Sequence, residues 1–173
     1  MAFNFNFRHA QDEKEIRKLE KFLLLQPLGY LNYEDWVSRV REELLAEYKR
    51  SILFFSDGYL VGNLVFQPHK QFPRIREAKN ERVHPKLQGR YCGAFMFKQM
   101  EAESPEDYDA IICDTRSDQI GVMSMLKSLG YEELLRVPLY DKNVEDVVMI
   151  KRFEKTPEGI FSPIKRTLIS STA

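Results

Sequence analysis

The hydrophobic and polar positions of the chain change their period several times, and each change predicts the next element. Residues 3–8 (FNFNFR) alternate aromatic and polar side chains, which is typical of a half-buried strand. Asp12 with Glu15 three residues later then resembles a helix capping box. Apolar residues follow at helical spacing: Ile16, Leu19, Phe22 and Leu23. This helix is expected to end near residues 27–29, and a second helix to begin at Asn32 as its N-cap.

A hairpin is expected next. Two apolar runs, residues 51–56 (SILFFS) and 59–67 (YLVGNLVFQ), flank the dipeptide Asp57-Gly58, and such a pair favours a two-residue hairpin turn. Residues 74–83 predict a polar-rich strand that stops before Pro85, because the residue before a proline avoids the helical region.

The second half of the chain predicts an alternation of helices and strands. The expected elements are a helix over residues 94–103, a buried strand over 108–114, a helix over 117–129, and strands over 131–137 and 144–153. The order is therefore β α α β β β α β α β β, an α/β arrangement. Residues 154–173 show no clear period, and we expect an extended tail or a packed arm.

Composition narrows the function classes. A chain of 173 residues with 43% hydrophobic and 30% charged side chains predicts one soluble domain. The formal net charge is +0, so no overall field favours nucleic acid or a membrane surface. Cys92 and Cys113 form no CxxC pair and the three histidines are scattered, which argues against a zinc site. The start of the chain does not resemble a signal peptide and no apolar run would span a membrane, so we expect a cytoplasmic location with reduced thiols.

The stretch from His84 to Met100 (HPKLQGRYCGAFMFKQM) carries the candidate chemistry. It places a cationic, glycine-bearing turn before an expected helix, although neither a GxGxxG nor a GxxxxGK[ST] pattern is present. A helix N-terminus offers unpaired N–H groups and a partial positive charge, and Lys86 and Arg90 add cations, so the stretch predicts an anion site. In the alternative interpretation, Gly89 and Gly93 only shape a strand-to-helix turn.

At this position in the element order, the stretch resembles the hallmark loop of the GNAT superfamily (the GCN5-related N-acetyltransferases), whose pattern is Gln/Arg-x-x-Gly-x-Gly/Ala. Gln88 and Gly93 match the pattern, whereas Tyr91 stands where the family has its first glycine. Three shorter strings resemble other family segments: RHAQD at 8–12, DGYLVG at 57–62 and LGYE at 129–132. The resemblance covers about residues 3–153.

The resemblance implies a single domain over residues 1–153, followed by a C-terminal arm over 154–173. It implies a mixed, mostly antiparallel sheet with helices on both faces and a strand–loop–helix unit that binds coenzyme A. It also implies that the chain transfers the acetyl group of acetyl-CoA to an amine by direct attack, without a metal. The cofactor-binding residues implied are Arg82, Val83, Gln88, Gly89, Arg90, Tyr91, Cys92, Gly93 and Ala94. Tyr91 leaves two alternatives, since either the loop keeps ordinary backbone angles or cofactor binding is weakened.

The catalytic residues are also implied only by the resemblance. In family members a glutamate on the fourth strand often acts as base, and the matching position here is Glu77, with Glu81 as second candidate four residues on. Both are alternatively solvated or ion-paired carboxylates. Many members carry a tyrosine acid at the place of Leu126, which this chain lacks; nothing singles out Tyr140 as its replacement.

Further residues have two interpretations each. Cys92 is either a reactive thiol or, more commonly at such a place, a small core residue. The aromatic residues around the expected second helix either border the acceptor pocket or pack on the sheet: Tyr30, Tyr33, Trp36 and Tyr48. By analogy with family members that dimerise through terminal strands, residues 154–173 are the candidate for a homodimer contact.

Three functions remain open at this stage. The first is an N-acetyltransferase acting on a small-molecule or peptide amine, with no nucleic acid partner indicated. The second is a degenerate member that binds coenzyme A or a protein without turnover, which Tyr91 and Leu126 motivate. The third is transfer of a larger acyl or aminoacyl group.

Overall fold

The computed structural model describes residues 4–27, 32–153 and 161–170. The chain divides into two compact units, which are treated separately below. The first contains residues 1–67 and 79–102, and the second contains residues 68–78 and 103–173. None of the helices in the described ranges combines the length and the apolar composition that crossing a membrane requires.

The structure is a mixed α/β fold with a seven-stranded sheet in the order β1-β2-β3-β4-β5-β7-β6. The strands are β1 (Phe5–His9), β2 (Arg50–Ser56), β3 (Tyr59–Pro68), β4 (Ile75–Val83), β5 (Ala110–Arg116), β6 (Glu132–Asp141) and β7 (Val144–Arg152). The helices are α1 (Glu13–Leu24), α2 (Tyr33–Leu45), α3 (Cys92–Ala102), α4 (Ile120–Ser128) and α5 (Phe161–Ser170). β4 and β5 pair in parallel, whereas β1–β2, β2–β3, β5–β7 and β6–β7 pair antiparallel. The expected mixed, mostly antiparallel sheet is confirmed.

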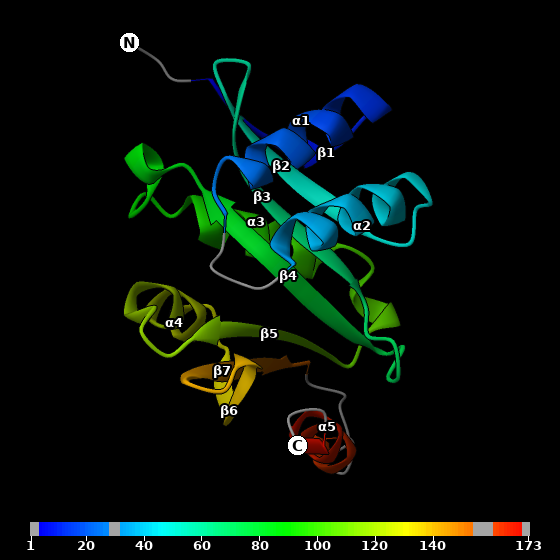
Figure 1. The fold of residues 1–173 in the computed structure, drawn as a ribbon, viewed down its shortest axis with the longest axis vertical. Helices are drawn as coiled ribbons and strands as arrows, with labels where there is room; N and C mark the ends of the chain where they lie inside the picture. Colours follow the sequence, from blue (N-terminus) through cyan, green and yellow to red (C-terminus); the bar gives the residue numbers. More distant parts are fainter. Residues whose placement is uncertain (1–3, 28–31, 154–160, 171–173) are drawn as a thin grey trace. The chain divides into compact units, whose positions relative to one another are not determined.

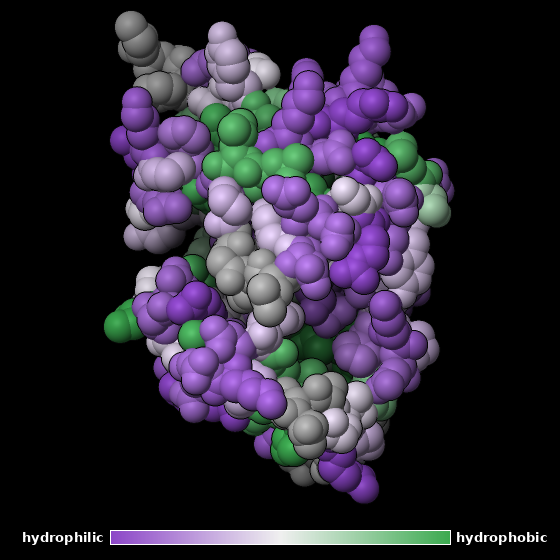
Figure 2. All heavy atoms as spheres, viewed as in Figure 1, coloured by the Kyte–Doolittle hydropathy of each residue, from purple (hydrophilic) through white to green (hydrophobic). Residues whose placement is uncertain are grey.

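In the first unit, helices cover both faces of the strands. Figure 1 shows α1 and α2 over one face of β1–β3 and α3 behind the other. The core under α1 and α2 contains Leu19, Phe22, Leu23, Tyr33, Val37, Val40, Leu44, Leu53, Phe55 and Val65. On the opposite face, Phe7 stacks on Phe54 with 4.3 Å between ring centroids, and Phe95 of α3 approaches Phe7. Hydrophilic side chains cover most of the outer surface over α2, whereas hydrophobic side chains gather over part of α1 (Figure 2).

The starts of α1 and α2 differ from each other. Asp12 caps α1 as expected, because its Oδ1 accepts the N–H of Glu15 at 2.8 Å. The Glu15 carboxylate accepts the N–H of Gln11 and two bonds from the Arg8 guanidinium, both at 2.6 Å. At α2, the expected side-chain cap is wrong, since Asn32 has a left-handed φ of 60° and its side chain makes no capping bond.

The hairpin between β2 and β3 is confirmed, with positive φ at both turn residues, Asp57 and Gly58, as a primed turn requires. Four residues after the turn, Gly62 cannot carry a side chain without a clash. A Cβ there would lie 2.9 Å from the carbonyl oxygen of Arg82 and 3.0 Å from Cδ1 of Phe54. The close approach of β4 to β3 therefore depends on this glycine.

The second unit has its own core between strands and the C-terminal helix. Its buried residues are Ile75, Ala110, Ile112, Leu134, Val137, Val148, Ile150 and Ile164. Ile164 belongs to α5, so residues 161–170 form a packed helical arm, which agrees with the second of the two expected alternatives. The rest of the expected arm, residues 154–160 and 171–173, lies outside the described residues. α4 begins at Ile120, three residues after the expected start at Ser117.

Candidate active site

The loop between β4 and α3 is tied to the strands by its own polar groups. The backbone N–H of His84 donates to the Val61 carbonyl at 2.7 Å, which anchors the end of β4 to β3. A short 3₁₀ turn then spans Pro85–Leu87. The Gln88 side chain reaches back and donates through Nε2 to the Val83 carbonyl at 3.1 Å. The glutamine of the predicted motif therefore fixes the shape of the loop.

Six consecutive backbone N–H groups follow, those of residues 89–94, and none has a hydrogen-bond acceptor among the residues that the structure describes. Gly89 has a φ of 74° and Tyr91 a φ of 62°, so left-handed residues interrupt the loop twice. Backbone N–H groups left free at a turn and at a helix start are suited to binding an anion. The last three groups belong to the first turn of α3, where the helix dipole adds positive charge. Lys86 and Arg90 are exposed beside them.

The segment of β4 that leads into the loop carries a carboxylate with an unusual pKa. Glu81 is half-buried, and this burial raises its pKa to about 7, although the nearby Arg82 charge acts in the opposite direction. The Arg82 guanidinium is held by its Nη1, which donates to the Glu81 carbonyl oxygen at 2.7 Å. The charge on Glu81 also reaches the thiol of Cys92, so the carboxylate and the start of α3 lie within electrostatic range. A carboxylate with this pKa is well matched to general-base work near neutral pH.

Comparison with known proteins identifies the fold. No protein-family model matches the chain, and no curated protein is similar enough to count as a match. Among solved structures, an aminoglycoside 6′-N-acetyltransferase complexed with coenzyme A is similar, with 15% identity, a TM-score of 0.71, and coverage of 88% of this chain and 99% of that chain. The chain yncA from Salmonella typhimurium, solved with its cofactor acetyl-CoA, is 14% identical with a TM-score of 0.72, covering 89% and 96%. The ribosomal-protein-S18-alanine N-acetyltransferase from Escherichia coli is 11% identical with a TM-score of 0.71, covering 90% and 97%.

The chain has the GNAT fold. These similarities extend over nearly the whole length of each neighbour, so they concern the complete fold and not only the loop. The fold predicted from the motif order is therefore confirmed. At these identities the comparison speaks for the fold, and the roles of individual residues rest on the geometry of this chain.

Tyr91, which stands where the resemblance expects the first glycine of the loop, has a left-handed backbone. Its φ is 62°, so the first of the two alternatives, a loop with ordinary backbone angles, is wrong. A bulky L-residue costs about 1–2 kcal/mol in this region. The ring is 77% exposed. The loop thus keeps a glycine-like path at the expense of strain.

Cys92 is a core residue of the GNAT loop. Its side chain is only 5% exposed, and burial raises the pKa of the thiol above its ordinary value. A reactive thiol needs the opposite shift, because the thiolate is the nucleophile. The structure supports the packing interpretation, in which Cys92 contributes its backbone N–H to the loop and its sulfur to the core. Cys113 is buried as well.

Glu77 and Glu81, the two predicted bases, differ in their surroundings. Glu77 lies opposite Ile112 on the neighbouring parallel strand, is half-buried and has interaction partners of its own. Asn80 lies between the two glutamates with a left-handed φ of 49°. This left-handed residue interrupts the regular two-residue period of the strand between them.

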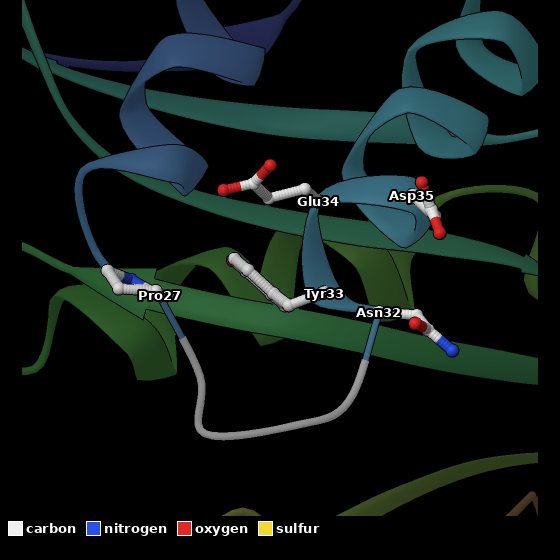
Figure 3. Close-up of a pocket in the computed structure, with 5 residues that line it drawn as sticks. All are labelled: Pro27, Asn32, Tyr33, Glu34 and Asp35. Carbon is white, nitrogen blue, oxygen red and sulfur yellow. The ribbon is translucent and has the colours of Figure 1, made fainter.

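The aromatic residues near α2 have mostly packing roles. Tyr33 is buried, its hydroxyl donates to the Leu23 carbonyl at 3.2 Å, and its ring stacks with Trp36. Tyr30 lies outside the described residues. A shallow hollow of about 380 Å³ is lined by Pro27, Asn32, Tyr33, Glu34 and Asp35 (Figure 3). The carboxylates of Glu34 and Asp35 lie in the first turn of α2, where negative charge interacts favourably with the helix dipole. This role in the helix accounts for them, and we assign no binding function to the hollow.

Leu126 and Tyr131, at the end of α4, are packing residues. They are 1% and 3% exposed respectively. Tyr140 lies near the end of β6 with its side chain about half exposed. No acid is assigned among these three residues. Within the described ranges, no group of three or more His, Cys, Asp or Glu side chains could hold a metal ion.

Sequence reasoning missed three residues that shape the site, namely Gly62, Asn63 and Asn80. Glycine and asparagine are both depleted in strand interiors, so their presence inside β3 and β4 was a usable signal. It points to an irregular strand and not to a particular chemistry.

Proposed function

We propose that the chain is an acetyl-CoA-dependent N-acetyltransferase. The observation that carries the proposal is the run of six unpaired N–H groups over residues 89–94 at the start of α3. In a GNAT fold this loop is suited to the diphosphate of coenzyme A, because each diphosphate oxygen needs donors and the helix dipole favours negative charge. Arg82, Val83 and the residues from Gln88 to Ala94 would hold the donor substrate.

Glu81 has the properties that the acceptor half of the reaction needs. An amine attacks a thioester only when it is neutral, so a proton must leave an ammonium or the attacking nitrogen. With a pKa of about 7, a large fraction of Glu81 is ionised near neutral pH, so the carboxylate is available to accept this proton. The raised pKa also makes it a stronger base than an ordinary carboxylate. The new carbon–nitrogen bond replaces the carbon–sulfur bond, and the sulfur leaves as thiolate or thiol. Glu77, which the resemblance placed first, is the second candidate for the base in this proposal.

The acceptor is proposed only as a class. One structural neighbour is named for an aminoglycoside and another for the alanine of a ribosomal protein, so amine acceptors of very different size occur on this fold. We propose a small-molecule or peptide amine.

Calorimetric titration with acetyl-CoA tests the proposed cradle. We expect micromolar or tighter binding, weakened about tenfold by Arg90→Ala, because one charge-assisted bond to a phosphate contributes about 1.4 kcal/mol or more. Arg39→Ala is the matched control, since Arg39 is an exposed arginine on α2. If acetyl-CoA does not bind to the folded protein, the chain is a GNAT-fold module without this substrate.

A thiol-release assay with a panel of primary amines tests turnover. Glu81→Gln is expected to lower kcat by about 10²-fold or more and to remove the acid limb of its pH profile near pH 7. Binding without turnover across the panel would favour the non-catalytic alternative. An unchanged pH profile in Glu81→Gln, together with a lost limb in Glu77→Gln, would return the role of base to Glu77.

A further inference from the structure

Asn63 is a fully buried amide in the middle of an apolar strand. Packing alone would favour an apolar side chain at this position. Its side chain is 0% exposed, and its register partner on β2 is Leu53, which belongs to the core under α1 and α2. Its Nδ2 donates to the carbonyl oxygen of Asn80 at 2.8 Å. This bond fixes the orientation of the amide, because a carbonyl oxygen can only accept.

The other end of the same amide is left unsatisfied. Oδ1 of Asn63 is buried and has no donor among the residues described by the structure. An unpaired buried acceptor costs about 1–3 kcal/mol, which an apolar side chain of similar size would avoid. The position is therefore not optimised for stability. What the amide provides is the single bond to Asn80.

That bond acts on the one irregular residue in β4. Asn80 has a φ of 49° inside the strand, a conformation that asparagine tolerates better than most L-residues. On the far side of Glu81, the carbonyl of Arg82 comes so close to Gly62 that no Cβ fits between them. Two neighbouring residues of β3 thus contact β4 immediately before and immediately after Glu81.

We propose that Asn63 is a positioning residue for Glu81. By holding the Asn80 carbonyl, Asn63 keeps β4 bent and so determines on which side of the strand the Glu81 carboxylate lies. The physical reason is the two-residue period of a strand, because a bend that relaxes into regular extension moves the following side chain to the other face. The proposal rests on the proposed function, in which Glu81 is the base.

The experiment compares Asn63→Ala with Gln67→Ala. Gln67 is a matched control, because it is also a buried amide on β3, four residues further along the strand, on the same face as Asn63. The first readout is the titration of Glu81, followed by carboxyl carbon NMR in protein labelled at glutamate. We expect the Glu81 titration near pH 7 to move down by one unit or more in Asn63→Ala and to stay in place in Gln67→Ala.

The second readout is kinetic. Asn63→Ala is expected to lower kcat at pH 7 by about 10²-fold or more, because displacing a catalytic group by only about 1 Å can already have an effect of this size, while KM for acetyl-CoA stays within a few-fold. A purely structural amide would lower stability in both variants without moving the Glu81 titration or the pH profile. That result, or an equal shift in both variants, overturns the proposal.

A second pair of variants keeps the test decisive if Asn63→Ala does not fold. Asn80→Gly retains the carbonyl and tolerates the left-handed backbone, so Glu81 should titrate as in the wild type. Asn80→Val retains the carbonyl but disfavours that backbone, so the titration should shift although Asn63 is intact. Identical titrations in both variants would overturn the proposal. Failure of the proposed function is distinguishable, because these titrations need no acetyl-CoA.

Discussion

Replacing Tyr91 by glycine is expected to stabilise the protein, although it deletes a large side chain. The tyrosine has a φ of 62°, which costs an L-residue about 1–2 kcal/mol, and glycine removes this cost. The ring is 77% exposed, so little burial is lost. Glycine also gives the unfolded chain more freedom, which costs about 0.5–1 kcal/mol. The net gain is about 0–1.5 kcal/mol, or up to about 6 °C in Tm for a chain of this size.

Two control variants separate the backbone from the ring. Tyr91→Ala removes the ring but keeps the strain, so its free energy of unfolding should stay close to that of the wild type. Tyr59 is 76% exposed, almost the same as Tyr91, and lies on β3 outside the positive-φ residues. Tyr59→Gly should therefore destabilise the protein, because glycine loses more conformational freedom on folding and Tyr59 has no left-handed backbone for it to relieve. Urea unfolding with an unchanged m-value is the assay.

The reasoning about Tyr91 fails in two ways that the assay can show. If Tyr91→Ala gains as much stability as Tyr91→Gly, the ring and not the backbone is the source of the strain. If Tyr91→Gly is less stable than the wild type, the tyrosine ring makes stabilising contacts that outweigh its left-handed backbone.

Three further predictions concern stability. Burial raises the pKa of Glu81 in the folded state to about 7, above its unfolded value near 4.3. The wild type should therefore lose stability as the pH rises from about 4 through 7. Urea unfolding midpoints should show that Glu81→Gln is more stable than the wild type by up to about 3 kcal/mol at pH 8 and equally stable at pH 4. The bond from Arg8 lowers the pKa of Glu15 to about 2, so the ion pair stabilises the fold above pH 4.3 and this stabilisation is lost as the pH falls to 2. Glu15→Gln should be about 1–2 kcal/mol less stable than the wild type at pH 7. A difference in stability that persists at pH 2 would contradict this. Gly62→Ala should lower the free energy of unfolding by about 1–3 kcal/mol, because its Cβ would clash with the backbone. Gly121→Ala on α4 has open space around it and should not lower the stability. Equal effects of the two substitutions in thermal melts would refute the close approach at Gly62.

The features that sequence predicted correctly are local ones. The Asp57-Gly58 turn needs only two residues that tolerate positive φ, and the cap of α1 needs only Asp12 and the N–H of Glu15. The loop before α3 was found because its composition and its place in the element order agree. Such signals act within a few residues, so one sequence is enough to read them.

The features that sequence missed depend on distant partners. Helix α5 was not predicted, and its buried residue Ile164 packs against strands far away in the chain. Asn80, with its left-handed backbone, accepts a bond from Asn63, which is 17 residues earlier. The resemblance placed Glu77 first by its spacing from Gln88, and such spacing carries no information about the surroundings of Glu81. The burial that raises the pKa of Glu81 is likewise a tertiary property.

Several departures from a relaxed structure lie on β3, on β4 and in the loop before α3. Asn80 and Tyr91 have left-handed backbones, Oδ1 of Asn63 lacks a donor among the described residues, and ionised Glu81 is partly desolvated. Each departure opposes folding by about 1 kcal/mol or more. A domain that served only as a scaffold would gain stability by losing any of them, whereas an enzyme keeps those that its reaction needs. Glu81→Gln separates the two cases, because under the catalytic proposal it gains stability at pH 8 as it loses turnover.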